Sequence, residues 1–319
     1  MPLKPILMTP AYRHGSMTPW GGDQLQPLYN KAVPGEHTGE SLELSAIPGL
    51  ESRDEIGRTL TELIENFGEK LIGTKVGSPF PLLLKLIDAR EQLSVQVHPD
   101  DAYAKEHHGK LGKNEAWVIL HAAPGAELIM GLKDGVTKEQ LWEKSLEGRA
   151  VEGLLNKVKV QSGDVFYIPA GTVHAIGGGL VLYEIQQSSD LTYRLYDWGR
   201  VDAQGKGREL HLEHSINVTT PASHPQSAMA DLLQKDGSGT VERMLDTPFF
   251  QLDRLSHCHG LKLQPDLDRF SVITALEPMS LHFDGEKMQV AAGQTVMLPA
   301  DGYALTLEGA SALMARPAI

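Results

Sequence analysis

The sequence predicts a mainly β protein built on barrels or sandwiches. The chain of 319 residues contains 32 Gly and 19 Pro, and between these breaks it consists mostly of short runs in which apolar and polar residues alternate. Such alternation is typical of a strand with one buried face, and many short strands separated by turns favour an all-β barrel or sandwich core. The length also leaves room for two small domains that share an interface.

Strand candidates fall into two groups, before and after the Pro-, Ser- and Gly-rich stretch 219–240. That stretch is expected to be a linker around one short helical turn. The first group comprises 81–88, 93–98, 115–120, 126–132, 157–161, 164–169 and 180–187, and the second comprises 249–255, 270–276, 294–299 and 303–309.

Three helical segments are expected to interrupt the strands, at about 51–70, 100–108 and 137–156. Ser52 is the expected N-cap of the first, and Asp100 or Asp101 that of the second. In the third, Thr137 and Gln140 have the spacing of a capping box, and the segment is expected to split near Gly148 into two short helices.

Composition narrows the classes of function. The chain has 29 Lys and Arg against 41 Asp and Glu, a formal net charge of −12. This charge argues against non-specific nucleic-acid binding, which requires clustered basic residues that neutralise phosphates. A small anionic ligand remains compatible if it meets a local basic pocket. Cys258 is the single cysteine, so a disulfide framework and a thiolate metal site are excluded. No apolar run approaches the roughly 20 residues of a membrane span and no signal peptide is evident, so a cytoplasmic protein without a membrane partner is expected.

A short internal repeat suggests two related barrels. Residues 162–176 and 292–306 both read Gly, five residues, Pro-Ala, a turn and a renewed strand. The position of His174 in the first copy is occupied by Ala304 in the second. Two barrels of common origin, of which only the first keeps a ligand, would give this pattern, and chance similarity between two β-turns is the alternative.

Polar residues on one face of an expected strand raise the possibility of a metal site. In "SVQVH" (94–98), Ser94, Gln96 and His98 project to the face opposite the two valines. If that face meets solvent, the pattern is ordinary amphipathicity. If it lies inside a barrel, the three polar groups need a partner such as a metal ion.

Two further strands can aim ligands at the same point. Glu115 lies in "GKNEAWVIL" (112–120), where it shares a strand face with Lys113. His174 begins a strand after a tight turn that Gly171 permits. The candidate ligands are therefore Gln96, His98, Glu115 and His174. Imidazole nitrogens, a carboxylate and an amide oxygen without sulfur suit zinc, and could also hold manganese, iron or cobalt.

The segment Gly163-x5-Pro169-x-Gly171-x2-His174 resembles the second sequence motif of the cupin superfamily. In chain order, "LSVQVHPDD", "GKNEAWVIL", "GDVFYIPAGTVHAI" and "YEIQQSSDLTYRLYDWGR" make the sequence similar to the type I mannose-6-phosphate isomerases (phosphomannose isomerases) in their short bacterial form. The similarity runs from "WGG" at Trp20 to about Asn217, and weakens beyond the linker to the level of the fold.

This resemblance implies a fold of two cupin (jelly-roll) barrels with a helical insertion. It implies a metal-bearing barrel at 1–235, a smaller degenerate barrel without metal at 236–319, and one zinc ion per chain. The family's zinc ligands fall on Gln96, His98, Glu115 and His174. The implied reaction interconverts mannose 6-phosphate and fructose 6-phosphate through a cis-enediol, so the implied partner is a small phosphorylated hexose. Whether the protein is a monomer or a dimer is left open.

The resemblance also implies roles for residues around the metal. Arg194 in "LTYRLYD" matches the family's catalytic arginine, Lys113 a pocket lysine, Asp190 an acidic residue, and Ser94 the serine before "QVH". Lys85 lies inside the apolar run "PLLLKLID", where a lysine is costly to bury unless it is paired.

We therefore expect Ser94, Lys85, Lys113 and Arg194 to bind the substrate and its phosphate. Arg194, Lys113 and Asp190 are the catalytic candidates, since Lys113 beside a bound cation could supply a neutral amine for proton transfer. Asp190 or Glu184 could serve as the base instead. Arg194 could alternatively form a structural salt bridge with Asp190 or Asp197.

Two other functions are compatible with the motifs. The first is an iron cupin oxygenase that uses the same ligands, and the second is a non-catalytic cupin that binds a sugar phosphate. The remaining histidines are expected to lie outside the site. His107 and His108 close a helix, and His211 and His214 have helical spacing without a third ligand.

Overall fold

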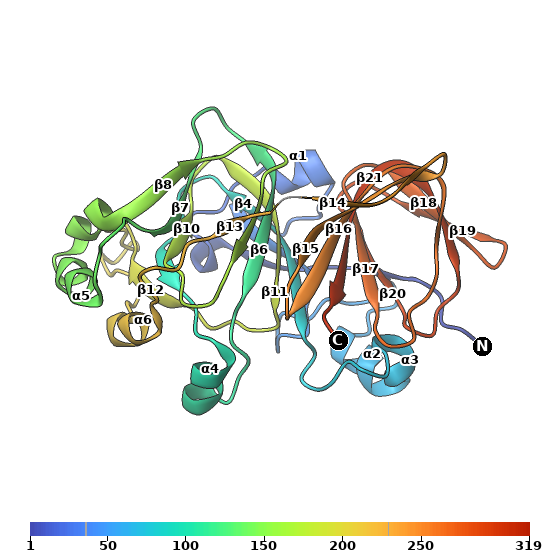
Figure 1. Cartoon of the computed structure of the whole chain (residues 1–319), viewed down its shortest axis with the longest axis horizontal. Coiled ribbons are helices and arrows are strands. Elements are labelled where there is room, and N and C mark those ends of the chain that lie inside the picture. Colours follow the sequence, from blue (N-terminus) through green and yellow to red (C-terminus); the bar gives the residue numbers. More distant parts are fainter. Residues whose placement is uncertain (36, 229) are drawn as a thin grey trace.

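The computed structural model describes residues 1–35, 37–228 and 230–319 and forms two β barrels that lie side by side (Figure 1). The first barrel is made of a seven-stranded and a five-stranded sheet, and the second of a nine-stranded sheet, all with antiparallel neighbours. The prediction of a mainly β fold with two cupin barrels is confirmed, and each of the eleven expected strands overlaps a strand of the structure.

The seven-stranded sheet has the spatial order β13 (Gln226–Ser227), β9 (Val165–Ile168), β6 (Glu115–Ala122), β11 (Leu180–Gln187), β4 (Leu82–Ala89), β3 (Thr38–Leu44) and β2 (Ala11–His14). The five-stranded sheet has the order β12 (Tyr193–Tyr196), β5 (Val95–Val97), β10 (His174–Ile176), β7 (Glu127–Leu132) and β8 (Leu155–Lys159).

The nine-stranded sheet follows the path β1 (Ile6–Met8), β20 (Thr295–Leu298), β17 (Ser271–Ala275), β21 (Leu305–Pro317), β16 (Phe250–Leu263), β15 (Gly239–Asp246) and β14 (Asp231–Asp236). Off this path, β18 (Met279–Phe283) pairs with β21, and β19 (Glu286–Val290) pairs with β18. The first strand of the chain thus belongs to the second barrel. The expected division after residue 235 falls within β14 and stays a prediction.

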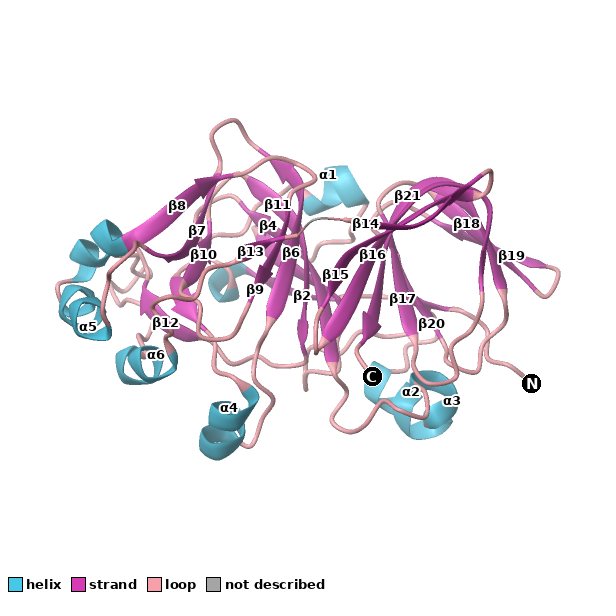
Figure 2. Cartoon of the chain, in the orientation of Figure 1, coloured by secondary structure: helices cyan, strands magenta, loops and turns pink. Residues whose placement is uncertain are grey.

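The helices lie outside the sheets (Figure 2). They are α1 (Leu25–Tyr29), α2 (Leu60–Phe67), α3 (Glu69–Ile72), α4 (Asp101–His108), α5 (Lys138–Leu146) and α6 (Leu212–Val218), with 3-10 turns at Gly15–Met17 and Gly148–Leu154. Among the helices of the described residues, none has both the length and the apolar composition that a membrane crossing needs.

Two expected helix caps and one helix break are confirmed. The Asp100 side chain accepts from Tyr103 N at the start of α4, and Thr137 forms the capping box of α5 with Gln140. α5 ends before Gly148, where the 3-10 turn begins.

The expected helix at 51–70 is wrong over its first part. Helix α2 begins after Thr59, which forms a capping box with Glu62. The Ser52 hydroxyl instead accepts from Ser45 N, and Arg53 pairs with Thr9 through the main chain. Because Ser52 is engaged by the neighbouring segments, it caps no helix.

The expected linker at 219–240 is likewise corrected. Gln226–Ser227 pairs with β9 of the first barrel, and β14 pairs with β15 of the second. The described residues of this stretch contain no helical turn beyond the end of α6. Main-chain pairing with the two barrels therefore outweighs the local Pro, Ser and Gly content.

The two copies of the internal repeat share one local structure. Val165–Ile168 and Thr295–Leu298 are strands of equal length, each followed by a turn. His174 is the first residue of β10, whereas Ala304 directly precedes β21. Their common origin stays a prediction.

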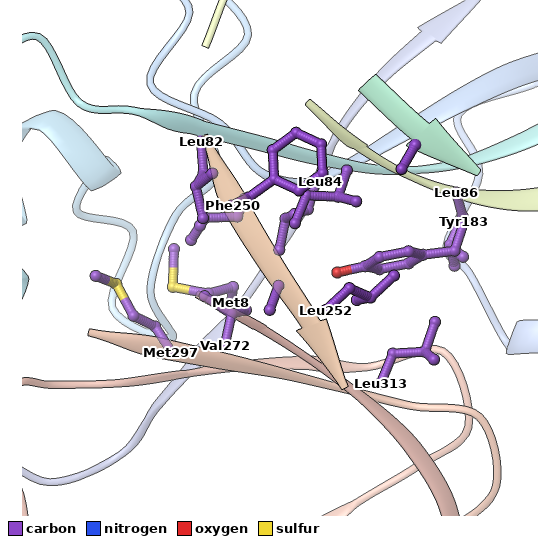
Figure 3. Close-up of a cluster of buried hydrophobic side chains, with 14 of the residues drawn as sticks. Met8, Leu82, Leu84, Leu86, Tyr183, Phe250, Leu252, Val272, Met297 and Leu313 are labelled. Atoms are coloured by element: carbon purple, nitrogen blue, oxygen red, sulfur yellow. The ribbon is translucent and has the colours of Figure 1, made fainter. Parts of the chain in front are cut away.

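One apolar core joins the two barrels. Figure 3 shows side chains of β4 and β11 packed against side chains of β16, β17 and β21. The labelled members from the first barrel are Leu82, Leu84, Leu86 and Tyr183, and those from the second are Phe250, Leu252, Val272 and Leu313. Most of these side chains are fully buried, so the second barrel fills one side of the sheet that carries part of the site.

A row of side chains crosses the five-stranded sheet and faces the interior of the first barrel. Gln96 on β5 is the register partner of Arg194 on β12 and of His174 on β10. Direct partners on neighbouring antiparallel strands point to the same face. The motif residues of three separate segments are thereby brought onto one line.

A second row crosses the seven-stranded sheet. Lys85 on β4 is opposite Glu184 on β11, which is opposite Trp117 on β6. The rings of Trp117 and His174 lie 5.5 Å apart, edge to face. This contact links the two rows across the barrel interior.

Candidate metal centre and adjoining cleft

Three of the predicted ligands meet in the buried interior of the first barrel. His98, Glu115 and His174 are each almost or fully buried. One ligand atom of each lies within 4.8 Å of the others. Glu115 Oε1 lies 3.2 Å from His174 Nε2, and Glu115 Oε2 lies 3.5 Å from His98 Nε2.

Both imidazoles are held in the orientation that a metal ligand requires. His98 Nδ1 is 2.9 Å from the carbonyl oxygen of Leu191, and His174 Nδ1 is 2.9 Å from that of Thr172. Since a carbonyl oxygen only accepts, each Nδ1 carries a proton, and Nε2, which faces Glu115, is the ring nitrogen left to bind a metal ion. A second hydrogen bond of this kind is the usual support of a metal-bound histidine.

The fourth predicted ligand lies at the edge of this group. Gln96 Nε2 is 3.3 Å from His174 Nε2, and its Oε1 is 3.4 Å from the Ser94 hydroxyl. Rotation of the amide group by about half a turn exchanges the two atoms. The amide oxygen then faces His174 Nε2.

Glu115 is a buried carboxylate with no regular hydrogen bond. Neither oxygen accepts a bond of good geometry from the described residues, although Lys113 Nζ lies 2.7 Å from Oε2. Burial acts to raise the pKa of Glu115, but the Lys113 ammonium, followed by His98 and His174, together outweigh it and hold that pKa well below its usual range. Burial and the same ammonium lower the pKa of His98 well below its usual value.

These donors fit a divalent cation. A buried ionised carboxylate without regular hydrogen bonds is costly. A metal ion would bind all three groups at once, and the N and O donor set without sulfur suits zinc. Lys113 Nζ, which is also 3.1 Å from His98 Nε2, contacts the atoms that such an ion would bind.

Tight packing of the main chain sets the direction of His174. Gly171 in the preceding turn has φ +85°, and a side chain there would meet Thr220 Oγ1 at 2.9 Å and Val218 O at 3.0 Å. A residue with a Cβ would be strained in this conformation and would also collide. The close approach of the C-terminal end of α6 therefore requires a glycine at this position of the motif.

The row formed by Lys85, Glu184 and Trp117 is fully hydrogen-bonded. Glu184 accepts from Lys85 Nζ at 2.9 Å and from Trp117 Nε1 at 2.9 Å. Lys85 also lies 3.5 Å from Glu40, which accepts from Arg13 at 3.0 Å. Burial acts to lower the pKa of Lys85, but the two carboxylates outweigh it and raise that pKa above its usual value. Lys85 is buried and paired, and Glu184 does not face solvent.

Arg194 lies where the first row opens toward solvent. Its Nε donates to the Ser94 hydroxyl at 3.3 Å, and its Nη1 donates to the Glu209 carbonyl at 2.8 Å. Among the described residues, Arg194 makes no ion pair with Asp190 or Asp197. The alternative of a structural salt bridge is therefore wrong, and the positive charge of Arg194 has no carboxylate partner.

The two neighbouring acids have other partners. Asp190 accepts from Lys110 Nζ at 2.7 Å. Burial acts to raise the pKa of Asp190, but the bond from Lys110 outweighs it and lowers that pKa. Asp197 is paired with Arg200 and Arg208.

A cleft of about 260 Å³ connects these groups. Its charged lining consists of five cations, Arg13, Lys85, Lys113, Arg194 and Arg208, and three carboxylates, Glu40, Glu184 and Asp190. Gln96 and Ser94 line it as well, so it reaches the metal centre. Four of these cations are paired with carboxylates: Arg13 with Glu40, Lys85 with Glu184, Lys113 with Glu115 and Arg208 with Asp197. Arg194 is the lining cation without an ion pair among the described residues.

Sequence reasoning missed three of the charged lining residues. Arg13, Glu40 and Arg208 come from segments far from the ligand motifs. Glu40 lies in "GESLEL" on β3, and only its position on a strand next to Lys85 gives it a role. A buried lysine implies a carboxylate partner. The position of Lys85 inside an apolar run was the one signal in the sequence for such a partner, and it did not identify Glu40.

The fold and the site define a two-barrel cupin with a buried His–Glu–His cluster beside a cationic cleft. A family model described as phosphomannose isomerase type I, catalytic domain, matches residues 20–116. A mannose-6-phosphate isomerase of Streptococcus mutans is 42% identical over 249 residues, which cover 77% of each chain. One from Bacillus subtilis is 38% identical over 317 residues, which cover 97% of each chain. This chain belongs to the type I phosphomannose isomerase family.

Solved structures agree with this assignment. The crystal structure of a mannose 6-phosphate isomerase from Bacillus subtilis matches with a TM-score of 0.90 at 32% identity, covering 98% of this chain and 99% of that one. A zinc-bound mannose 6-phosphate isomerase matches with a TM-score of 0.78 at 15% identity. At that identity the second likeness shows the fold alone.

Proposed function

We propose that this chain interconverts mannose 6-phosphate and fructose 6-phosphate through a cis-enediol, with one zinc ion held by Gln96, His98, Glu115 and His174. The observation that carries the proposal is the buried Glu115 carboxylate, which lacks regular hydrogen bonds and is faced by two Nε2 atoms. Its setting beside a cationic cleft, in a chain so similar to two mannose-6-phosphate isomerases, supports the substrate.

The reaction moves a proton between two neighbouring carbons and develops negative charge on the oxygens beside them. A bound divalent ion stabilises such charge, and the stabilisation grows toward the transition state. Arg194 is permanently charged and has no carboxylate partner among the described residues. It is placed to balance negative charge on the enediolate or on the phosphate.

We assign the proton transfer to Lys113 or Asp190, which both line the cleft. Lys113 contacts donor atoms of the metal centre, so metal binding competes with its present contacts. Asp190 is an ionised carboxylate but is held by Lys110. It can accept a proton from the substrate only after that ion pair opens.

We assign the binding of the sugar phosphate to Ser94, Lys85, Lys113 and Arg194. Of the three cations, Arg194 is the one most free to meet a phosphate. Lys85 is balanced by Glu184 and Glu40, so it supports the proposal as a fixed hydrogen-bond donor more than as a net charge. The charge of Arg194 also attracts an anionic substrate at a distance.

An enzyme-coupled assay with mannose 6-phosphate tests the proposal. The purified protein is measured before chelation, after removal of metal, and after titration with zinc. Turnover that is lost on chelation and restored by one zinc per chain supports it. Oxygen consumption with iron would favour an oxygenase, and binding of mannose 6-phosphate without turnover would favour a non-catalytic protein. Either of these results would contradict the isomerase.

A further inference from the structure

We propose that His211 is a positioning residue, which fixes Arg194 by closing the free edge of strand β12. This inference rests on the proposed function, in which Arg194 acts on the substrate. His211 has no place in the metal centre and does not line the cleft. Its contacts with Arg194 nevertheless fix the course of the main chain at that residue.

Strand β12 is the outermost strand of the five-stranded sheet, and within the described residues it pairs with β5 alone. On its outer side, Arg194 N donates to His211 Nδ1 at 3.2 Å, and His211 N donates to the Arg194 carbonyl at 2.8 Å. A single residue thus satisfies the N–H and the C=O that an edge strand leaves open. His211 does at this point what a sixth strand would do.

The same segment also holds the side chain of Arg194. The guanidinium Nη1 donates to the carbonyl of Glu209, two residues before His211, at 2.8 Å. Segment 209–211 therefore makes three hydrogen bonds to Arg194, two to its main chain and one to its side chain. The direction of the guanidinium depends on where this segment lies.

Two helices fix the residue next to Arg194. The Tyr193 ring stacks on His214 of α6, with ring centres 4.8 Å apart and planes 13° from parallel. The Tyr193 hydroxyl lies 2.7 Å from Nε2 of His108, the last residue of α4. His211 is itself the N-cap residue of α6. The histidines that seemed unconnected in the sequence are thus gathered around β12.

The contact from Arg194 N requires an unprotonated Nδ1 on His211, because an N–H can only donate. Burial, and then the charge of Arg194, lower the pKa of His211, whereas the nearby Glu209 raises it and His214 lowers it. The neutral ring is consistent with the acceptor role that the geometry requires.

Two substitutions of similar size test the inference on the zinc-loaded enzyme. In His211→Asn the amide oxygen occupies the position of Nδ1 and can accept from Arg194 N. In His211→Leu the shape is similar but no acceptor is present. We expect kcat of His211→Leu to fall by about 10- to 100-fold, the order that a misplaced catalytic group costs. His211→Asn should keep kcat within about threefold of the wild type, and both variants should keep one zinc per chain.

A double substitution separates positioning from a general loss of packing. If His211 acts through Arg194, then His211→Leu should lower kcat no further in an Arg194→Ala background. His121→Ala is the control, because His121 is an exposed histidine of β6, outside the segments that hold β12. It should leave kcat unchanged.

Three results would overturn the inference. One is a kcat of His211→Leu within twofold of the wild type, another is equal losses in the Asn and Leu variants, and the third is an undiminished further loss in the Arg194→Ala background. Wild-type zinc enzyme that does not turn over mannose 6-phosphate would instead overturn the proposed function, and with it the role given to His211. The wild-type assay therefore distinguishes the two failures.

Discussion

His174 is fixed by its own main chain before any metal binds, through the bond from its Nδ1 to the carbonyl of Thr172. Its Nε2 therefore points at Glu115 without a cost of orientation at the moment of binding. The second barrel shows the alternative, because Ala304 stands at the matching position of the repeat. At this position of the repeat, the second barrel therefore lacks an imidazole.

Replacement of His174 by Ala should release the metal and abolish turnover. Loss of one ligand leaves a remnant that holds a divalent ion poorly, so zinc affinity should fall by at least about 100-fold. Elemental analysis after dialysis, together with the coupled assay, measures both effects. His121→Ala, an exposed histidine of β6, is the control. Stoichiometric zinc in His174→Ala would remove His174 from the ligand set.

Replacement of Arg194 by Ala should leave zinc bound and lower kcat by roughly 100- to 1,000-fold, the range seen when one donor to a developing oxyanion is lost. Arg194→Lys keeps the charge but not the planar fork, and should recover only part of the rate. Steady-state kinetics of the two variants at saturating zinc measure this. Turnover of Arg194→Ala equal to that of the wild type would exclude the residue from the mechanism.

At this scale the sequence predicted the ligands better than their surroundings. The candidate ligands lie in local motifs whose spacing follows from strand alternation and a tight turn, so the cluster of His98, Glu115 and His174 that the structure brings together could be named in advance. Glu40 and Arg13 could not, because they reach the cleft only through strand pairing between distant segments. The contact between His211 and Arg194 likewise depends on the path of a loop.

At the scale of elements, the three strands β4, β11 and β6 carry a polar rung through an otherwise apolar sheet. Lys85, Glu184 and Trp117 are direct register partners and bond to one another in sequence across the strands. The rung makes the register of these strands specific, since a shift by one residue would bury each charge without its partner.

Replacement of Lys85 by Met should lower the free energy of unfolding at pH 7 by about 3–5 kcal/mol, because Glu184 loses its buried cation and Glu40 is left with Arg13. The folded pKa of Glu40 is lowered: burial opposes this, but Lys85 and then Arg13 outweigh it. A carboxyl whose pKa is lowered on folding stabilises the fold at pH values above its pKa in the unfolded chain, near 4.3. This stabilisation is lost as the pH falls through its pKa in the folded protein.

The difference in stability between wild type and Lys85→Met should therefore shrink as the pH falls through the lowered pKa of Glu40, where that carboxyl takes up a proton. Urea unfolding at a series of pH values measures it. Lys75→Met is the control: Lys75 forms an exposed pair with Asp268, and its loss should cost less than about 1 kcal/mol. A difference that stays constant with pH would contradict the assigned network.

The mispredicted elements are those in which contacts with distant segments outweigh the local sequence pattern. The polar stretch 219–240 has the composition of a linker, yet parts of it extend both barrels as β13 and β14. Ser52 has the chemistry of an N-cap, but its hydroxyl is used by Ser45 N, and the helix begins at the stronger capping box of Thr59 and Glu62. Amino-acid composition does not show which edge strand of a sheet is free to pair with another segment.

At the scale of the whole molecule, the two barrels share one core instead of meeting at a polar surface. Side chains from both barrels form a single cluster, which includes the fully buried Tyr183 and Phe250. A buried ion pair between Lys31 and Glu43, 2.6 Å apart, adds to it. Lys31 Nζ also donates to the Gly293 carbonyl and Thr295 Oγ1 donates to Glu43, so the pair bonds to the second barrel.

The two barrels should therefore unfold in one cooperative transition. Phe250→Ala, which removes a ring of the shared core, should lower stability by about 3–5 kcal/mol and shift the thermal loss of zinc binding by the same amount as the calorimetric transition. Calorimetry and metal release on heating measure the two. Leu267→Ala, at an exposed position of the second barrel, is the control. Two separate heat-absorption peaks would contradict the shared core.

The shared core also limits how this protein can be rearranged. Consider a hybrid in which residues before about 235 come from this chain and the rest from a distant relative. Its two barrels would meet at apolar faces of mismatched shape around Tyr183 and Phe250. Viable hybrids should therefore exchange β4, β11, β16 and β21 together. The second barrel supplies the back wall of the barrel that carries the candidate ligands.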